Sequence, residues 1–271
     1  MMTKLVMTIC LFSVLTSFVV SQEICIEGST TVGPIVEAFV EATKSDSNVR
    51  FTVKKTGSGD GVAALIDGRC DIAATSRFMK KEEYAKAIAA GRIPIPFTIC
   101  MDGVCFIVHP SNTVRSLNKQ QVTDIYTGKI KSWQMLGGPN IPVVAISRDT
   151  SSGTYEVFHE LAVGKAKLGN SVEYTNSNPQ MFTRISTTPG AIGYVGIGFL
   201  QEGVATVQFE NIVPNKESVA NGTYPLSRPL YLFTDGYPKM GSVLMKFCNF
   251  YLTEEGQDVI TAKGFVPFTK Y

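Results

Sequence analysis

Short apolar segments with strand character alternate with helix-like segments from residue 24 onward, and this order restricts the fold more than any other feature of the chain. The pattern predicts strands over residues 24–27, 49–55 and 70–75, with helices over 34–44 and 61–67 between them. Alternation of this kind is typical of parallel strands joined by crossover helices. The sequence therefore predicts an α/β fold.

The second half of the chain continues the alternation in a different order. A charged helix-like segment over residues 80–90 precedes an apolar strand over 100–108, which we interpret as a crossing into a second lobe. Further elements are expected over residues 118–126 (helix), 143–147 (strand), 153–163 (helix), 190–200 (a Gly-rich apolar stretch), 229–233 (strand), 242–251 (helix) and 253–263 (helix). The last three return the chain to the first lobe.

The expected architecture is two α/β domains joined by two crossing strands. Lobe 1 comprises residues 22–103 and 227–271, and lobe 2 comprises residues 104–226. Ligands of open α/β sheets bind beyond the carboxyl ends of the strands, so a ligand cleft is expected between the lobes.

Residues 1–21 have the pattern of a secretory signal peptide. Lys4 precedes an apolar run over 5–20, and Ser21 provides a small residue for cleavage. A membrane anchor is the competing interpretation, but the run is shorter than the ~20 apolar residues that a spanning helix needs. Neither Cys10 nor Cys25 follows the small residue typical of a lipid-acceptor cysteine. We expect a soluble mature chain in the periplasm.

Charge and cysteine content restrict the possible partners. Loss of Lys4 with the signal peptide lowers the formal charge from +2 to +1, and no basic run remains to neutralise a nucleic-acid backbone. An odd number of cysteines then remains, so at least one thiol stays free or pairs outside the chain, and apolar neighbours favour buried thiols. The two histidines lie far from any Cys-x-x-Cys pair, so neither a metal nor a cofactor is predicted.

Three loops combine glycines with hydroxyl side chains where a predicted strand gives way to a predicted helix. They cover residues 28–34, 56–61 and 148–154. The first ends at Pro34, whose missing N–H costs nothing at a helix start. In the second, Ser58 lies between glycines that let the backbone approach a ligand closely. The third adds the guanidinium of Arg148 to its hydroxyl groups.

Each loop alone has a structural explanation, because Ser, Thr, Asp and Gly cap helices. Three such loops spread over both lobes indicate more, since each offers free amides at the positive end of a helix dipole. An arginine fork among many neutral donors suits a compact oxyanion with several acceptor oxygens. The sequence therefore predicts capture of a tetrahedral anion.

Two other interpretations fit the sequence poorly. Gly57, Gly59 and Gly61 follow a strand, but the third glycine comes one residue early for a dinucleotide fingerprint. A serine hydrolase would need a Gly-x-Ser-x-Gly elbow, which the sequence lacks. His109 at a strand end and His159 in an apolar helix are both interpreted as structural.

Six segments carry a resemblance to a known family: residues 28–32 (GSTTV), 57–61 (GSGDG), 71–77 (DIAATSR), 125–130 (IYTGKI), 148–154 (RDTSSGT) and 189–196 (PGAIGYVG). In this order and spacing they resemble the phosphate-binding proteins of phosphate-specific ABC transporters, members of the type II periplasmic binding-protein superfamily. The resemblance covers essentially the whole mature chain.

The resemblance also implies a set of phosphate contacts. By motif these fall on Thr30 or Thr31, Val32, Ser58, Arg148, Ser152, Gly153 and Thr154. Many family members place an aspartate after the serine of the third strand, where it accepts a hydrogen bond from protonated phosphate. Here Ser76 is followed by Arg77, which either donates to the ion or supports the cleft from its rim. Asp60 and Asp149 are the candidate acceptors, and Asp149 is expected rather to orient Arg148.

The function that the resemblance implies is capture of inorganic phosphate for an ABC permease in the inner membrane, by a monomer that is not an enzyme. An extracytoplasmic phosphate sensor or surface protein that uses the same cleft is the alternative. A phosphate-ester hydrolase ranks last, because no single motif holds both a nucleophile and a base.

Overall fold

The computed structural model describes residues 22–43 and 49–268, and the strands within them form one curled sheet. The main path through the sheet is β2-β1-β3-β10-β4-β8-β6-β7, and β9 pairs with both β4 and β5. The strands are β1 (Gln22–Gly28), β2 (Val49–Lys54), β3 (Ile72–Thr75), β4 (Pro94–Val108), β5 (Ser116–Leu117), β6 (Val144–Arg148), β7 (Glu173–Thr175), β8 (Ala191–Gly196), β9 (Ala205–Phe209) and β10 (Ser227–Asp235).

Helices connect these strands along the described chain. The α-helices are α1 (Gly33–Thr43), α2 (Ser58–Ile66), α3 (Lys81–Ala89), α4 (Lys119–Tyr126), α5 (Gly153–Val157), α6 (Asn178–Thr187), α7 (Lys216–Ala220), α8 (Val243–Asn249) and α9 (Glu254–Ala262). Shorter helical turns span Trp133–Leu136, Phe158–Ala162, Ile197–Phe199 and Phe250–Leu252.

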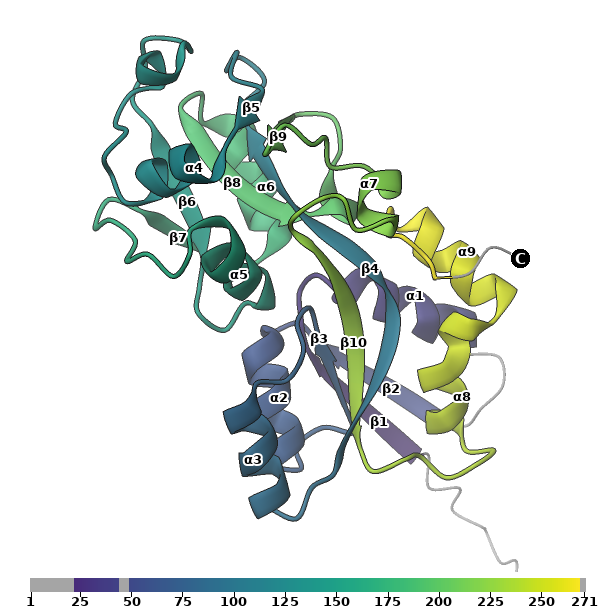
Figure 1. Ribbon diagram of the computed structural model, residues 1–271. Coiled ribbons are helices and arrows are strands. Elements are labelled where there is room, and N and C mark those ends of the chain that lie inside the picture. Colours follow the sequence, from purple (N-terminus) through teal and green to yellow (C-terminus); the bar gives the residue numbers. More distant parts are fainter. Residues whose placement is uncertain (1–21, 44–48, 269–271) are drawn as a thin grey trace, which may run out of the picture.

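Strand β4 belongs to both halves of the sheet. As far as Gly103 it pairs antiparallel with β10, which places Arg228 opposite Asp102. From Val104 onward it pairs with β8 and, on its other edge, with β9. The two halves lie at opposite ends of this long strand, as Figure 1 shows. The predicted α/β class with two lobes joined by crossing strands is therefore confirmed.

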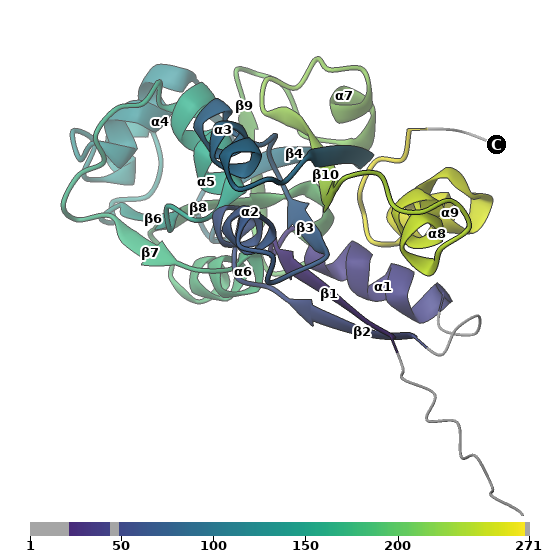
Figure 2. The same ribbon diagram turned by 90° about the horizontal axis from the view of Figure 1, so that it is seen from below.

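Lobe 1 places helices on both faces of β1, β2, β3 and β10 (Figures 1 and 2). On one face, Phe39 of α1 packs edge-on against Phe247 and Phe250, which lie in α8 and the turn that follows it. On the other face, Val62 and Leu65 of α2 are buried in a separate apolar cluster. Successive residues of a strand point to opposite faces, which is why β3 contributes to both clusters.

The core of lobe 2 contains aromatic residues that pack against Tyr194 of β8. The rings of Phe158 and Tyr194 stack with centroids 4.2 Å apart, and Tyr126 packs edge-on against Phe158. The indole of Trp133, the one tryptophan of the chain, is fully buried and donates to the carbonyl of Gly190 at 2.8 Å. The hydroxyl of Tyr194 also accepts from the amide of Arg148 at 3.0 Å, which holds β8 against the end of β6 and so fixes the position of the loop that follows β6.

Two of the predicted helices have different bounds. The helix expected over residues 61–67 begins three residues earlier, at Ser58. Gly57 precedes it with a φ of 131°, which only glycine readily adopts, and this turn of the backbone ends the loop before Ser58. The helix expected over residues 153–163 is α-helical only to Val157 and continues as a π-helical turn to Ala162.

Several elements of lobe 2, including the helix α6, were not predicted from the sequence. Ser177 caps this helix by accepting from the amide of Gln180, and Pro179 follows within its first turn. Both are ordinary helix-start signals. The helix places Asn178 at the junction of the lobes. Because the helix was not predicted, Asn178 was not predicted as a residue of the candidate site either.

The cysteines of the described chain are all unpaired: Cys25, Cys70, Cys100, Cys105 and Cys248. Four are buried, as the apolar neighbours predicted, and Cys25 is half-buried. Burial raises the pKa of the Cys70 and Cys248 thiols to about 12, so both stay protonated near neutral pH. The signal peptide predicted for residues 1–21 lies outside the described residues.

Trp133→Phe should lower the free energy of unfolding by about 2 kcal/mol, because it removes buried ring volume and leaves the Gly190 carbonyl with the Val144 amide as its remaining donor. Urea unfolding followed by circular dichroism measures the change. Met135→Ala is the matched control, since Met135 lies on the same helical turn but is exposed. Equal stability of W133F and the wild type would contradict the role given to this indole.

Candidate anion-binding site

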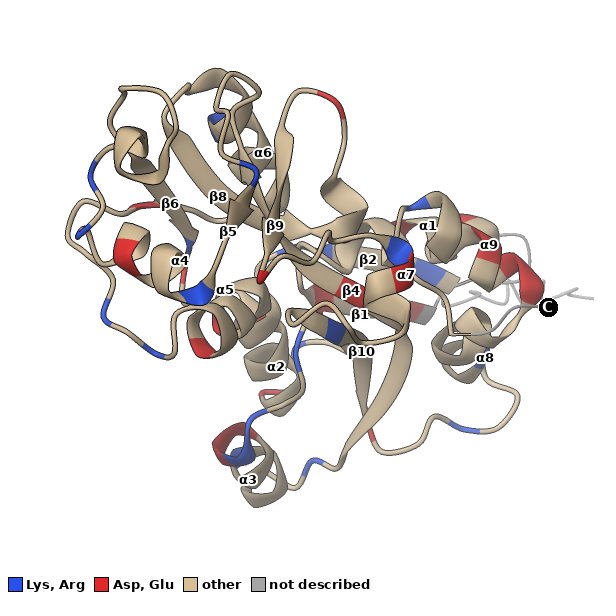
Figure 3. Ribbon diagram, turned by 45° about the horizontal axis from the view of Figure 1, so that its top comes forward, with Lys and Arg blue, Asp and Glu red and all other residues tan. Residues whose placement is uncertain are grey.

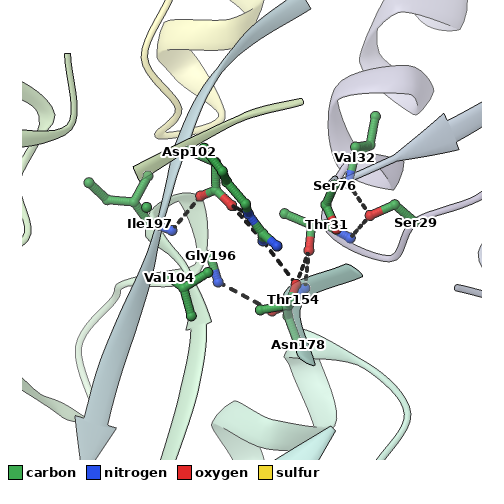
Figure 4. A network of polar contacts seen from close by, with 12 residues as sticks. Ser29, Thr31, Val32, Ser76, Asp102, Val104, Thr154, Asn178, Gly196 and Ile197 are labelled. Carbon is green, nitrogen blue, oxygen red and sulfur yellow. Dashed lines mark hydrogen bonds and ion pairs between the residues drawn. The ribbon is translucent and has the colours of Figure 1, made fainter. Parts of the chain in front are cut away.

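Threonine hydroxyls from the two lobes meet at the carboxyl end of β1. Thr31 Oγ1 lies 3.0 Å from Thr154 Oγ1, which is in the first turn of α5. The side-chain amide of Asn178 donates to Thr31 Oγ1 at 2.9 Å and to Thr30 Oγ1 at 3.5 Å. Figure 4 shows Thr31, Thr154 and Asn178 directed toward one another. The lobes are therefore in direct polar contact here.

Arg148 enters the same cluster from the end of β6. Its Nη2 donates to Thr30 Oγ1 at 3.3 Å and to the carbonyl of Asn176 at 2.9 Å, while Nε donates to the carbonyl of Thr175. Nη1 is buried and has no hydrogen-bond partner among the described residues. Burial lowers the pKa of the guanidinium, yet arginine remains protonated in proteins. The residue is thus a buried cation with free donors.

A second contact between the lobes joins the start of α2 to the start of α5. Ser58 Oγ accepts from the amide of Ser76 at 3.0 Å and lies 3.2 Å from Ser76 Oγ. A Cβ added to Gly153 would lie 2.6 Å from Ser58 Oγ and 2.7 Å from Ser76 Oγ. The amide of Gly59 also donates to the carbonyl of Ser151 at 2.9 Å. Only glycine fits at position 153 in this arrangement.

Val32 and Ser152 occupy helix-start positions within the site. The amide of Val32 points to Ser29 Oγ at 3.3 Å, just before α1. Ser152 caps α5 by accepting from the amide of Tyr155 at 3.2 Å. Both residues are buried. The eight residues that the resemblance marked as phosphate contacts are therefore all buried in the two contact regions or next to them, and so are Ser76 and Arg77.

The guanidinium of Arg77 lies between carboxylates of both lobes. Nη1 and Nη2 donate to the two carboxylate oxygens of Glu83 on α3 at 2.7 and 2.6 Å. Nε lies 2.7 Å from Glu156 Oε2 on α5, and Lys80 pairs with the other oxygen of Glu156. Figure 3 shows both signs of charge at the start of α3. Only the aliphatic stem of Arg77 approaches Gly153.

The two acidic candidates make no hydrogen bond to Thr30, Thr31, Thr154 or Asn178, which together are called the threonine cluster. Asp60 is exposed on the first turn of α2. Asp149 is half-buried, and its Oδ1 accepts from the amide and hydroxyl of Ser151 at 2.9 and 2.6 Å. The carbonyls of Thr175 and Asn176, rather than Asp149, hold the guanidinium of Arg148 by hydrogen bonds.

Three residues of this junction were missed in the sequence: Asn178, Asp102 and Arg228. Asp102 Oδ2 accepts from Arg228 Nε and Nη2 at 2.9 and 2.7 Å. Its Oδ1 accepts from the amide of Ile197 (Figure 4). A signal existed, because Asp102 lies within one apolar strand expected to link the lobes and Arg228 immediately precedes another.

The site is rich in donors and suits an oxyanion better than a cation. The buried guanidiniums of Arg148 and Arg228 lie here among several hydroxyls, and α2 and α5 both begin beside them. Within the described chain, no group of three or more His, Cys, Asp or Glu residues could hold a metal ion. None of the described helices combines the length and apolar character needed to cross a membrane.

A family model described as the PBP superfamily domain matches residues 19–255. The phosphate-binding protein PstS of Staphylococcus epidermidis is 32% identical to this chain over 257 residues, covering 90% of this chain and 78% of its own. That match decides the family. The chain belongs to the PstS family of the PBP superfamily.

Solved structures of PstS-like proteins agree with this assignment. A Clostridium perfringens protein described as the substrate-binding protein of a phosphate ABC transporter, solved with bound phosphate, is 31% identical with a TM-score of 0.83. That comparison covers 92% of this chain and all of the other. An ABC-type phosphate transport receptor from Vibrio cholerae is 29% identical with a TM-score of 0.73, covering 90% of this chain and 99% of that one. The type II fold expected from the sequence is confirmed.

Glu83→Gln should lower the free energy of unfolding by about 1–2 kcal/mol near neutral pH, because it weakens a hydrogen-bonded ion pair. Burial raises the pKa of Glu83, but the hydrogen bonds from Arg77 and from the amide of Lys80, together with the positive charges of both residues, outweigh burial and lower it. Its stabilisation is therefore full above the ordinary glutamate pKa of 4.5 and is lost as the pH falls through the lowered value.

Urea unfolding of wild type and E83Q at a series of pH values measures this difference. Glu82→Gln, at an exposed neighbouring position, is the control. A difference between wild type and E83Q that stays constant down to acid pH would contradict the assignment.

Proposed function

We propose that this protein captures inorganic phosphate between its lobes and delivers it to the permease of an ABC transporter. The carrying observation is the buried Arg148, which keeps a free Nη1 at the point where threonine hydroxyls of both lobes converge. Membership of the PstS family and its phosphate-bound relative support the choice of phosphate.

In this proposal the ion is held by donors from both lobes. Lobe 1 contributes Thr30 or Thr31, the amide of Val32, and Ser58, while lobe 2 contributes Arg148 and the start of α5. Ser76 lies beside Ser58 and is placed to contribute as well. Hydrogen bonds to a charged group are stronger than neutral ones, and few waters compete in a buried site. Anion binding would therefore stabilise the closed arrangement of the lobes.

The pairing of β4 supports the lobe boundaries that we propose. Division at residues 103/104 coincides with the change of β4 from β10 to β8 as its partner, and division at 226/227 coincides with the start of β10. We further propose that the protein is a monomer without enzymatic activity, exported through a signal peptide over residues 1–21 to meet a permease in the inner membrane.

The positions of the histidines support a binding role over hydrolysis. His109 Nδ1 contacts Ser111 Oγ at 2.8 Å in an exposed turn. His159 stacks on Tyr155, and its Nε2 lies 3.2 Å from the carbonyl of Ala166. Neither makes a hydrogen bond to a hydroxyl of the threonine cluster among the contacts described. A general base for hydrolysis would need such a contact.

Arg148→Ala should weaken phosphate binding by about thirtyfold or more, because a desolvated charge-assisted contact worth about 2 kcal/mol disappears. Isothermal calorimetry with phosphate, sulfate, arsenate and molybdate measures both affinity and selectivity. Arg69→Ala is the control, since Arg69 is exposed and pairs with Asp67 beyond the C-terminal end of α2. Unchanged phosphate affinity in R148A would reject the site.

Gly153→Ala should weaken phosphate binding at least tenfold while each lobe stays folded, because the added methyl would clash with Ser58 and Ser76 only when the lobes are closed. Gly59→Ala is the matched control: its Cβ would lie 3.4 Å from the Ser151 carbonyl, an ordinary contact. Calorimetry gives the affinities and circular dichroism the fold. Equal affinities of the two variants would argue against closure around the ion.

A further inference from the structure

A buried ion pair links the crossing strands at the edge of the anion site. Arg228 and Asp102 face each other in the register of β10 and β4, and both side chains are almost completely buried. The guanidinium uses only Nε and Nη2 on the carboxylate. The same Nη2 lies 2.9 Å from Thr154 Oγ1, which belongs to the threonine cluster. Arg228 is therefore in contact with the site on one side and with Asp102 on the other.

The free donors of Arg228 need an acceptor. Nη1 is buried without a hydrogen-bond partner in the described part of the chain, as is Nη1 of Arg148. Buried polar groups of native proteins are rarely left unpaired, and charged ones least of all. The two guanidiniums are joined through a chain of hydroxyl and amide contacts that runs over Thr30, Asn178, Thr31 and Thr154.

The charges at this junction do not balance. Of the hydrogen bonds that the two guanidiniums make within the described residues, only those to Asp102 reach a carboxylate. Burial lowers the pKa of Arg148, Tyr194 and Asp149 raise it, and the positive charge of Arg228 lowers it by the smallest amount, so the two cations repel each other weakly. Two buried cations against one such carboxylate leave an excess of positive charge, which an anion between them would neutralise.

The nitrogen donors also set the direction of the hydroxyl hydrogens. Thr154 Oγ1 accepts from Arg228, and Thr31 Oγ1 accepts from Asn178. A hydroxyl that already accepts from a fixed nitrogen keeps its own hydrogen to donate. One of these two hydroxyls donates to the other at 3.0 Å, which leaves the hydrogen of the second hydroxyl for an anion at the junction. Arg228 acts on the site in this second way, through Thr154.

We propose that Arg228 is a second cationic contact of the anion site, with Asp102 as the residue that positions it. This inference rests on the proposed function and adds a residue to it. Because Asp102 also accepts from the amide of Ile197 in lobe 2, the pair lies where both lobes and the ion meet. The anion is then held between two arginines, Arg148 from β6 and Arg228 from β10.

Phosphate calorimetry on Arg228→Met and Asp102→Asn tests the proposal by an asymmetry. R228M should lose about 10- to 100-fold in affinity, because a charge-assisted contact is removed. D102N keeps the cation but loses the carboxylate that positions it, so its loss of affinity should be clearly smaller than that of R228M. Arg228→Lys, which retains the charge, should recover part of the loss. Arg69→Gln is the control for loss of an exposed arginine.

A purely structural ion pair predicts something else. Both single variants would then lose thermal stability to a similar degree, and their folded fractions would bind phosphate alike. Equal affinities of R228M and wild type, or equal losses in R228M and D102N, would overturn the proposal.

The double variant D102N/R228M covers the case in which R228M alone does not fold. It removes both charges together, a change that buried pairs often tolerate. It should show the affinity loss of R228M, and wild-type affinity in it would overturn the role of Arg228. If the wild type binds phosphate and these variants lose no phosphate affinity, only this inference is rejected. If the wild type binds no phosphate, the proposed function is rejected as well.

Discussion

The sharing of β4 between the two halves of the sheet is the constraint on which the other features depend. Its first residues are fixed to lobe 1 through β10 and its last residues to lobe 2 through β8 and β9. The exchange at residues 103/104 fixes where the carboxyl ends of β1, β3 and β6 converge. Every residue of the threonine cluster follows a strand or begins a helix near that point.

The chemistry of the junction follows from its burial. Hydroxyls and guanidiniums that would be ordinary on a surface favour an acceptor strongly once water is excluded, since unpaired donors there are costly. The contacts are also divided between the lobes: Thr31 and Ser58 belong to one, while Arg148 and Thr154 belong to the other. An ion that satisfies them all holds both lobes at once, which couples binding to closure.

The sequence was sufficient for the fold class and for most of the site, because both rest on local patterns. Strand and helix alternation is visible along the chain, and the loops at 28–34, 56–61 and 148–154 have helix-start chemistry. Residues that act through long-range pairing were not visible in this way. Asp102 and Arg228 meet only through the register of β4 and β10. Arg77 reaches Glu156 only because the lobes come together.

The burial of Trp133 in the core of lobe 2 has an optical consequence. The indole is packed under the Gly190 carbonyl and belongs to one lobe alone, so its fluorescence reports the integrity of that core. The intrinsic fluorescence of Trp133 would therefore change little when the lobes close. A fluorescent sensor built on this scaffold would therefore need a dye attached where the lobes approach each other, beside the Gly59 and Ser151 contact.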